Sequence, residues 1–139
     1  MTDRHFQLRL QASYKNDENE VDDLSIEVLH EGEWEALDLN LRTPGFLMYI
    51  NALFSCQHLY MRANCAERDL LLASAEGELQ VDASEIWEIR DISVRFNATL
   101  RSGTVTDEAM HYITERMHHC PVSTNLPDHV PLKISVSLE

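Results

Sequence analysis

The sequence predicts an α+β fold in which three strands precede a long helix, two strands follow it, and a second helix and a closing strand come last. Three observations predict this order. Apolar and polar residues alternate in several segments, which is the period of a half-buried strand. No proline or glycine occurs between Gly45 and Gly77, so a long helix can form early in that interval. The chain has 139 residues, 44% of them hydrophobic, so we expect a single domain over residues 1–139.

Three segments before the long helix carry the strand pattern. Residues 6–12 alternate apolar and polar side chains, and residues 24–29 resume the alternation. Between them, the polar run 15–23 indicates a hairpin loop. A tight turn at residues 31–33 then precedes a third expected strand at residues 34–41.

A long helix is expected over residues 44–66. Thr43 is a good N-cap, and Pro44 is tolerated at the first helical position. Apolar residues of this segment would lie on most sides of the helix, which is typical of a central, buried helix. The helix keeps one narrow polar stripe, formed by Asn51, Ser55, His58 and Arg62.

The second half of the chain repeats both patterns. Residues 70–81 and 86–100 are extended stretches that predict a long antiparallel pair. A second helix is expected over residues 106–119, because acidic side chains in its first turn complement the helix dipole. Pro121 stops or restarts this helix, and residues 132–138 predict the closing strand.

The net charge and the first residues of the chain limit the partners and the cellular compartment that we expect. Eleven Lys and Arg against 24 Asp and Glu give a formal net charge of −13, which repels nucleic acid and anionic membrane surfaces, so we expect neither as a partner. Residues 1–5 do not open a signal peptide, and we expect a cytoplasmic protein. Thiols stay reduced in that compartment, so Cys56, Cys65 and Cys120 are expected to be free, catalytic or metal-binding.

The tetrad Cys120-Pro121-Val122-Ser123 lies 64 positions after Cys56. This motif, the spacing and the order of elements resemble the OsmC/Ohr family of osmotically inducible and organic hydroperoxide resistance proteins, over most of the chain. The resemblance implies an OsmC-like fold, with antiparallel sheets around a long central helix, in an intertwined homodimer. It also implies a thiol-dependent peroxidase, with no cofactor and no metal.

In that resemblance Cys56 reduces an organic hydroperoxide and becomes a sulfenic acid. Cys120 resolves the sulfenic acid as a disulfide, and a dithiol such as a lipoylated protein reduces the disulfide. Helix geometry independently separates Cys56 from Cys65. Nine residues at 100° each place them on opposite sides of the helix, about 13 Å apart along its axis, too far for a disulfide.

Two interpretations of Cys120 stay open. If Pro121 is the first residue of a new helical turn, Cys120 is its N-cap, and the helix dipole favours a thiolate there. Alternatively, Pro121 only kinks or ends the second helix. Histidines near the end of that helix have a dipole rationale, which is a simpler explanation than a metal site.

The sequence departs from the family pattern at the start of the long helix. Residues 43–47 lack the usual glutamate, which pairs with an arginine; Arg9 and Arg42 are the nearest candidates for that arginine. The family's spacing from the proline is one residue shorter, which would put Ser55 at the position of the nucleophile. Cys56 would then be a buried, inert thiol.

These departures support an alternative function. The chain would be an OsmC-fold protein without peroxidase activity that binds a small ligand near Asn51, Ser55, His58 and Arg62. In such a site His58 could act as a base, and Arg62 could hold an anion.

Overall fold

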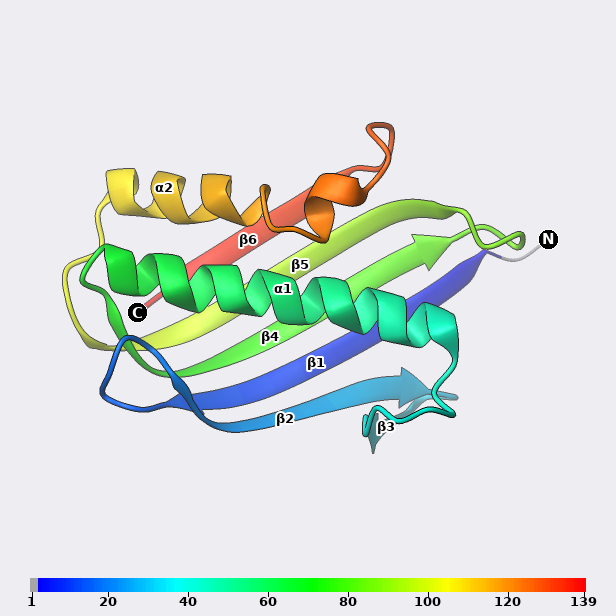
Figure 1. Cartoon of the computed structure of the whole chain (residues 1–139), viewed down its shortest axis with the longest axis horizontal. Helices are drawn as coiled ribbons and strands as arrows, with labels where there is room; N and C mark the ends of the chain where they lie inside the picture. The colour runs from blue at the N-terminus through cyan, green and yellow to red at the C-terminus, as the bar shows by residue number, and fades with distance from the viewer. Residues whose placement is uncertain (1–2) are drawn as a thin grey trace.

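The computed structural model describes residues 3–139 and has the expected order of elements, βββ-α-ββ-α-β (Figure 1). The elements are β1 (Arg4–Tyr14), β2 (Val21–His30), β3 (Glu33–Ala36), α1 (Gly45–Glu67), β4 (Leu71–Ala83), β5 (Ile89–Ser102), α2 (Asp107–Met117), the short 3-10 helix η1 (Ser123–Asn125) and β6 (Leu132–Leu138). The α+β class is therefore confirmed. The third strand is shorter than expected, because it ends at Ala36 rather than near residue 41.

The strands of residues 3–139 form one six-stranded sheet in the order β3-β2-β1-β4-β5-β6. β4 and β5 form the long antiparallel pair that was expected. One pairing differs from the expected antiparallel arrangement, because β6 at the edge of the sheet pairs parallel to β5. A parallel neighbour needs a crossover connection, and α2 lies within the connection between these two strands.

Both helices lie on the same face of the sheet, and α1 crosses its middle (Figure 1). The main core fills the space between α1 and the sheet. Phe54 of α1 stacks on Phe96 of β5 with ring centroids 5.8 Å apart. A Cβ atom on Gly77 would lie 2.6 Å from the Phe96 ring, so glycine makes room for this stack.

The expected burial of α1 on most sides is not found within one chain. The side that faces the sheet is buried, whereas Met48, Tyr49 and Leu59 on the other side are 39%, 41% and 44% exposed. Burial is one-sided because the sheet packs against only one side of this helix. α1 therefore presents an apolar surface that its own chain does not cover.

The two helices begin differently. Pro44, not Thr43, occupies the N-cap position of α1, because the Thr43 hydroxyl accepts a hydrogen bond from the Asn40 amide at 3.0 Å, in the preceding turn. In α2 the Thr106 hydroxyl accepts from the Ala109 amide at 3.1 Å, so the expected N-terminus of this helix is confirmed.

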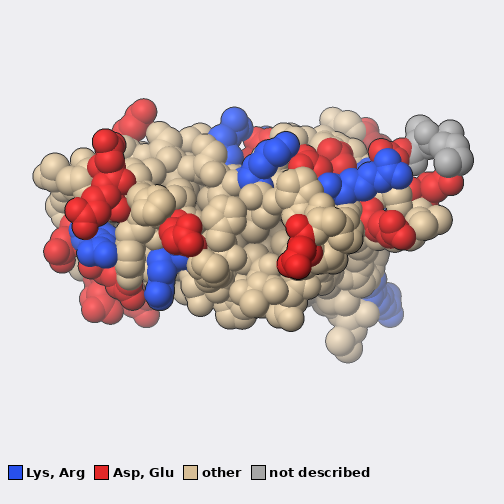
Figure 2. All heavy atoms as spheres, turned by 90° about the horizontal axis from the view of Figure 1, so that it is seen from above, with Lys and Arg blue, Asp and Glu red and all other residues tan. Residues whose placement is uncertain are grey.

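The surface carries more acidic than basic groups. In the view of Figure 2 the acidic side chains gather toward the two ends of the molecule, and uncharged atoms cover much of the middle. Among the described residues, no helix is both long enough and apolar enough to cross a membrane.

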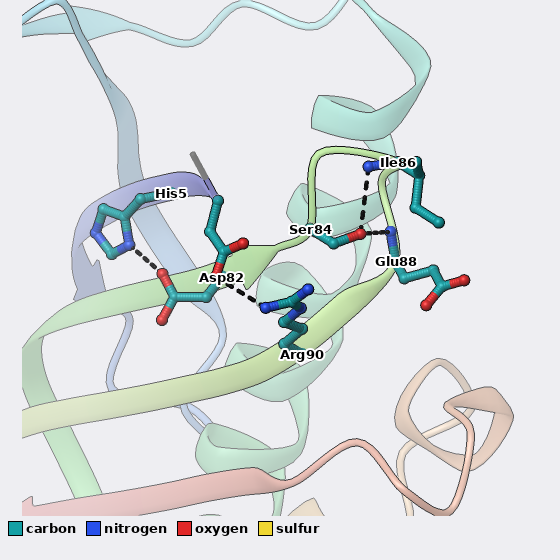
Figure 3. A network of polar contacts seen from close by, with 7 residues as sticks. His5, Asp82, Ser84, Ile86, Glu88 and Arg90 are labelled. Atoms are coloured by element: carbon teal, nitrogen blue, oxygen red, sulfur yellow. Dashed lines mark hydrogen bonds and ion pairs between the residues drawn. The ribbon is translucent and has the colours of Figure 1, made fainter. Parts of the chain in front are cut away.

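A polar network lies where β4 turns into β5 (Figure 3). The Ser84 hydroxyl accepts hydrogen bonds from the amides of Ile86 and Glu88, at 3.3 Å and 3.1 Å. Beside the turn, Nδ1 of His5 lies 2.6 Å from a carboxylate oxygen of Asp82. The His5–Asp82 contact is exposed, whereas Ser84 is buried; together these contacts hold the hairpin and the start of β1.

Candidate functional site

The structure brings together two of the three cysteines. Cys56 lies on α1 and is partly exposed, whereas Cys120 follows α2 and is 0% exposed. The two thiols are close enough for each to shift the pKa of the other. Cys65 is buried elsewhere in the core, where burial raises its pKa to about 12. Cys56 is therefore not fully buried, and its neighbouring thiol is Cys120.

The position of Cys120 follows from the local sequence. α2 ends at Met117, and a new turn begins after Pro121, where the Cys120 carbonyl accepts from the Thr124 amide at 3.0 Å. The Cys120 sulfur accepts from the Ser123 amide at 3.3 Å, which is the geometry of an N-cap. Of the two interpretations left open by the sequence, the structure therefore has the restarted turn.

A buried amide from α1 completes the surroundings of Cys120. Gln57 is 0% exposed, and its Nε2 donates to the Met117 carbonyl at 2.6 Å and to the Cys120 sulfur at 3.2 Å. Gln57 is not among the site residues predicted from the sequence. The available signal was a polar residue at helical spacing between two core residues, Phe54 and Met61.

The pKa values of the two thiols are shifted in opposite directions, and the groups that cause the difference are neutral. For Cys120, burial raises the pKa, but hydrogen bonds with the Ser123 side chain, the Ser123 amide and Gln57, together with the neighbouring Cys56 thiol, outweigh burial and lower it. For Cys56, burial and the neighbouring Cys120 raise the pKa, and a hydrogen bond from the Val122 backbone only partly offsets them. The more acidic thiol of the pair is thus the buried one.

Exposure to solvent is greater for Cys56 than for Cys120. Cys56 is the exposed member of the pair, and its neighbours on the open side of α1 include Tyr49 and Ala52, which are both exposed. Ser55 is exposed as well and makes no side-chain hydrogen bond within residues 3–139. A reactant arriving from solvent can therefore reach Cys56 more readily than Cys120.

The structure does not bring the predicted arginines to the thiols within one chain. Leu8 and Leu10 point into the core, so Arg9 between them lies on the opposite face of the sheet. There it donates to Glu27 at 2.8 Å, and its guanidinium lies 4.1 Å from the centre of the Trp34 ring. Arg42 is exposed in the turn before α1.

The polar stripe on α1 does not form one open site. Asn51 and His58 are buried, whereas Ser55 is exposed. His58 lies 2.7 Å from the Tyr14 hydroxyl and stacks on Phe96. Burial and, second, the nearby Arg62 lower the pKa of His58 to about 4. A neutral, packed histidine of this kind is a structural group, which weakens the ligand-binding alternative.

A separate apolar hollow lies at the N-terminal end of α1. Its volume is about 570 Å³. It is lined by residues of α1, the β4–β5 turn, β5 and the loop before β6: Phe46, Tyr49, Trp87, Glu88, Ile89, Pro127, His129 and Val130. None of these residues belongs to the polar stripe.

No family model and no curated protein matches this sequence. Solved structures do match it. An OsmC-like hydroperoxide resistance protein from Jannaschia sp. is 16% identical, with 88% of this chain and 86% of that chain covered and a TM-score of 0.58. An OsmC-like protein from Mycoplasma pneumoniae is 11% identical, with 92% and 94% covered and a TM-score of 0.56. A hypothetical protein from Aquifex aeolicus is 13% identical, with 83% and 87% covered and a TM-score of 0.60. The chain has the OsmC-like fold.

Proposed function

We propose that this OsmC-fold protein is a thiol-dependent peroxidase that reduces organic hydroperoxides with the Cys56–Cys120 pair. The observation that carries the proposal is the contact between these two thiols, which come from positions 64 residues apart. The match to a structure described as an OsmC-like hydroperoxide resistance protein supports the same substrate class. Cytoplasmic location, where dithiol reductants are available, belongs to this proposal.

The two cysteines have different tasks. Cys56, the accessible thiol, attacks the terminal oxygen of the hydroperoxide; the O–O bond breaks, an alcohol leaves, and Cys56 becomes a sulfenic acid. Cys120 then attacks the Cys56 sulfur, so a disulfide forms and water leaves. A dithiol, for example a lipoylated protein, reduces the disulfide and restores both thiols.

A homodimer is part of the proposal. The uncovered side of α1 exposes Met48 and Leu59, and the fully exposed Leu41 precedes the helix. Large apolar residues exposed on one side of a helix are typical of an interface. Leu59→Glu should convert a dimer to a monomer in sedimentation velocity; a wild-type protein that is already monomeric would contradict this part.

Turnover of a dithiol tests the peroxidase directly. Cumene hydroperoxide and dihydrolipoamide are added to the reduced protein, and consumption of the dithiol is followed. We expect turnover by the wild type and none above background by Cys56→Ser. Cys65→Ala is the matched control, because Cys65 lies in the core away from the pair, and it should keep the wild-type rate. If the Cys56→Ser and wild-type rates are equal, the proposal is wrong.

A further inference from the structure

Cys120 lies in an environment that is unusual for a buried thiol. It is 0% exposed, yet its sulfur accepts from two N–H groups, the Ser123 amide at 3.3 Å and Nε2 of Gln57 at 3.2 Å. The Ser123 hydroxyl lies 3.1 Å away, where it accepts from the Cys120 thiol and donates to the His118 carbonyl at 3.0 Å; it can donate to a thiolate only by turning away from that carbonyl. Burial opposes a negative charge, whereas directed donors favour it. Several donors on one sulfur suit a thiolate.

The orientation of the Gln57 amide is fixed by a second contact. The Met117 carbonyl can only accept, so the Gln57 atom 2.6 Å from it is the amide nitrogen and not the oxygen. That same nitrogen donates to Cys120. The amide oxygen is buried and has no hydrogen-bond partner among the described residues, as is also the case for Asn51 and Asn64 on the same helix.

We propose that Gln57 is a positioning residue that holds Cys120 as the thiolate of the resting pair, and that the Cys56 thiol donates its hydrogen to that thiolate. This inference rests on the proposed peroxidase function and assigns the resting charge to the resolving cysteine. The groups that act on the two sulfurs come from α1 (Gln57), from the turn after α2 (the Val122 backbone and Ser123) and from the thiols themselves. All of them apart from the thiols are neutral.

The reaction then balances without a charged side chain. As the Cys56 sulfur bonds to the terminal oxygen of the hydroperoxide, its proton passes to the Cys120 thiolate. The O–O bond breaks, and the alkoxide takes a proton from water, so that the negative charge leaves as hydroxide. Cys120, now a thiol, attacks the Cys56 sulfenic acid; the S–S bond forms, the S–O bond breaks, and the departing hydroxide takes the Cys120 proton and leaves as water. Two electrons pass from the thiol pair to the hydroperoxide.

Thiolate absorbance at 240 nm, titrated from pH 4 to 8.5 in the reduced protein without peroxide, tests the inference. The signal requires no reagent to reach the buried sulfur, and Cys65 stays protonated in this range because its pKa is about 12. Cys56→Ser should keep a thiolate below pH 8, and Cys120→Ser should lose it. If instead the signal survives in Cys120→Ser and is lost in Cys56→Ser, the resting charge is on Cys56 and the inference is wrong.

Gln57→Leu tests the positioning role, with Asn64→Leu as its matched control. Asn64 is also a buried amide on α1, but it donates to the Tyr60 carbonyl at 2.7 Å, within its own helix. Loss of one hydrogen bond to a charged acceptor should raise the titration midpoint by about one pH unit in Gln57→Leu. Asn64→Leu should leave it unchanged. Equal midpoints in Gln57→Leu and the wild type would overturn the role of Gln57.

If Gln57→Leu does not fold, the comparison of Cys56→Ser with Cys120→Ser still decides where the charge lies, and Ser123→Ala should raise the midpoint through loss of the neighbouring hydroxyl. Because the titration contains no peroxide, a low midpoint in a protein that does not turn over would refute the proposed function while supporting this inference. Turnover by a protein whose thiolate is on Cys56 would support the proposed function and refute this inference.

Discussion

Two neighbouring residues of α1, Gln57 and His58, lie in buried polar environments with opposite effects on charge. Gln57 faces the turn after α2, where directed donors lower the pKa of Cys120 in spite of burial. His58 faces the sheet, where burial lowers its own pKa to about 4 and also raises the pKa of Tyr14. The comparison shows that burial by itself suppresses charge, and that a buried group becomes more acidic only where donors point at it.

The largest expected effect is a loss of peroxidase turnover, caused by a change at the thiol pair. Cys120→Ser removes the resolving sulfur, so the Cys56 sulfenic acid has no neighbouring thiol and oxidises further to a sulfinic acid. Turnover with a dithiol should fall to background, and intact mass after excess hydroperoxide should show two added oxygens. An unchanged rate in this variant would show that the pair does not act as a unit.

The next largest effect is a loss of stability, caused by a change between α1 and the sheet. Phe96 stacks on both Phe54 and His58, so Phe96→Ala opens a cavity beneath α1. The free energy of unfolding should fall by about 3–5 kcal/mol, measured by urea denaturation. A loss below about 1 kcal/mol would mean that the stack contributes little to the fold.

The pH dependence of stability should report on His58. Its folded pKa of about 4 lies below the usual value of 6.5, so the unfolded chain binds a proton first as the pH falls. This contribution is complete above pH 6.5 and is lost as the pH falls toward 4, by up to about 3 kcal/mol.

Urea denaturation of the wild type and His58→Gln at pH 7, 5.5 and 4.5 measures this loss, because carboxylates titrate equally in both proteins. The wild type should lose more stability than the variant over this interval. Parallel profiles would contradict a neutral, buried His58.

The smallest effect concerns a single hydrogen bond. Tyr14→Phe removes the hydroxyl that lies 2.7 Å from Nε2 of His58 and should cost about 1 kcal/mol of unfolding free energy. Urea denaturation at pH 7 measures it. Peroxidase turnover should not change, because this contact is on the sheet side of α1; a loss of turnover would link the two regions.

The elements were predictable because their signals are local. Alternation located the strands, and the acidic first turn located the start of α2 to within a residue. The parallel edge pairing of β6 was not predictable, since alternation is the same in parallel and antiparallel strands. The far-face position of Arg9 could have been inferred, because Leu8 and Leu10 flank it.

The candidate site was predictable only in part. Helix geometry excluded Cys65 as the partner of Cys56, and the Cys-Pro-Val-Ser motif marked Cys120. Gln57 was not predicted because its contact with Cys120 joins residues 63 positions apart, and no local sequence pattern encodes such a contact. The uneven acidity of the two thiols depends on that contact, so it required the folded structure.

Disulfide mapping is the most direct test of the central claim. The reduced protein is treated with one equivalent of cumene hydroperoxide, alkylated under denaturing conditions, digested and analysed by mass spectrometry. The account predicts a Cys56–Cys120 disulfide with Cys65 alkylated as a free thiol. Three free thiols, or a disulfide that contains Cys65, would contradict it.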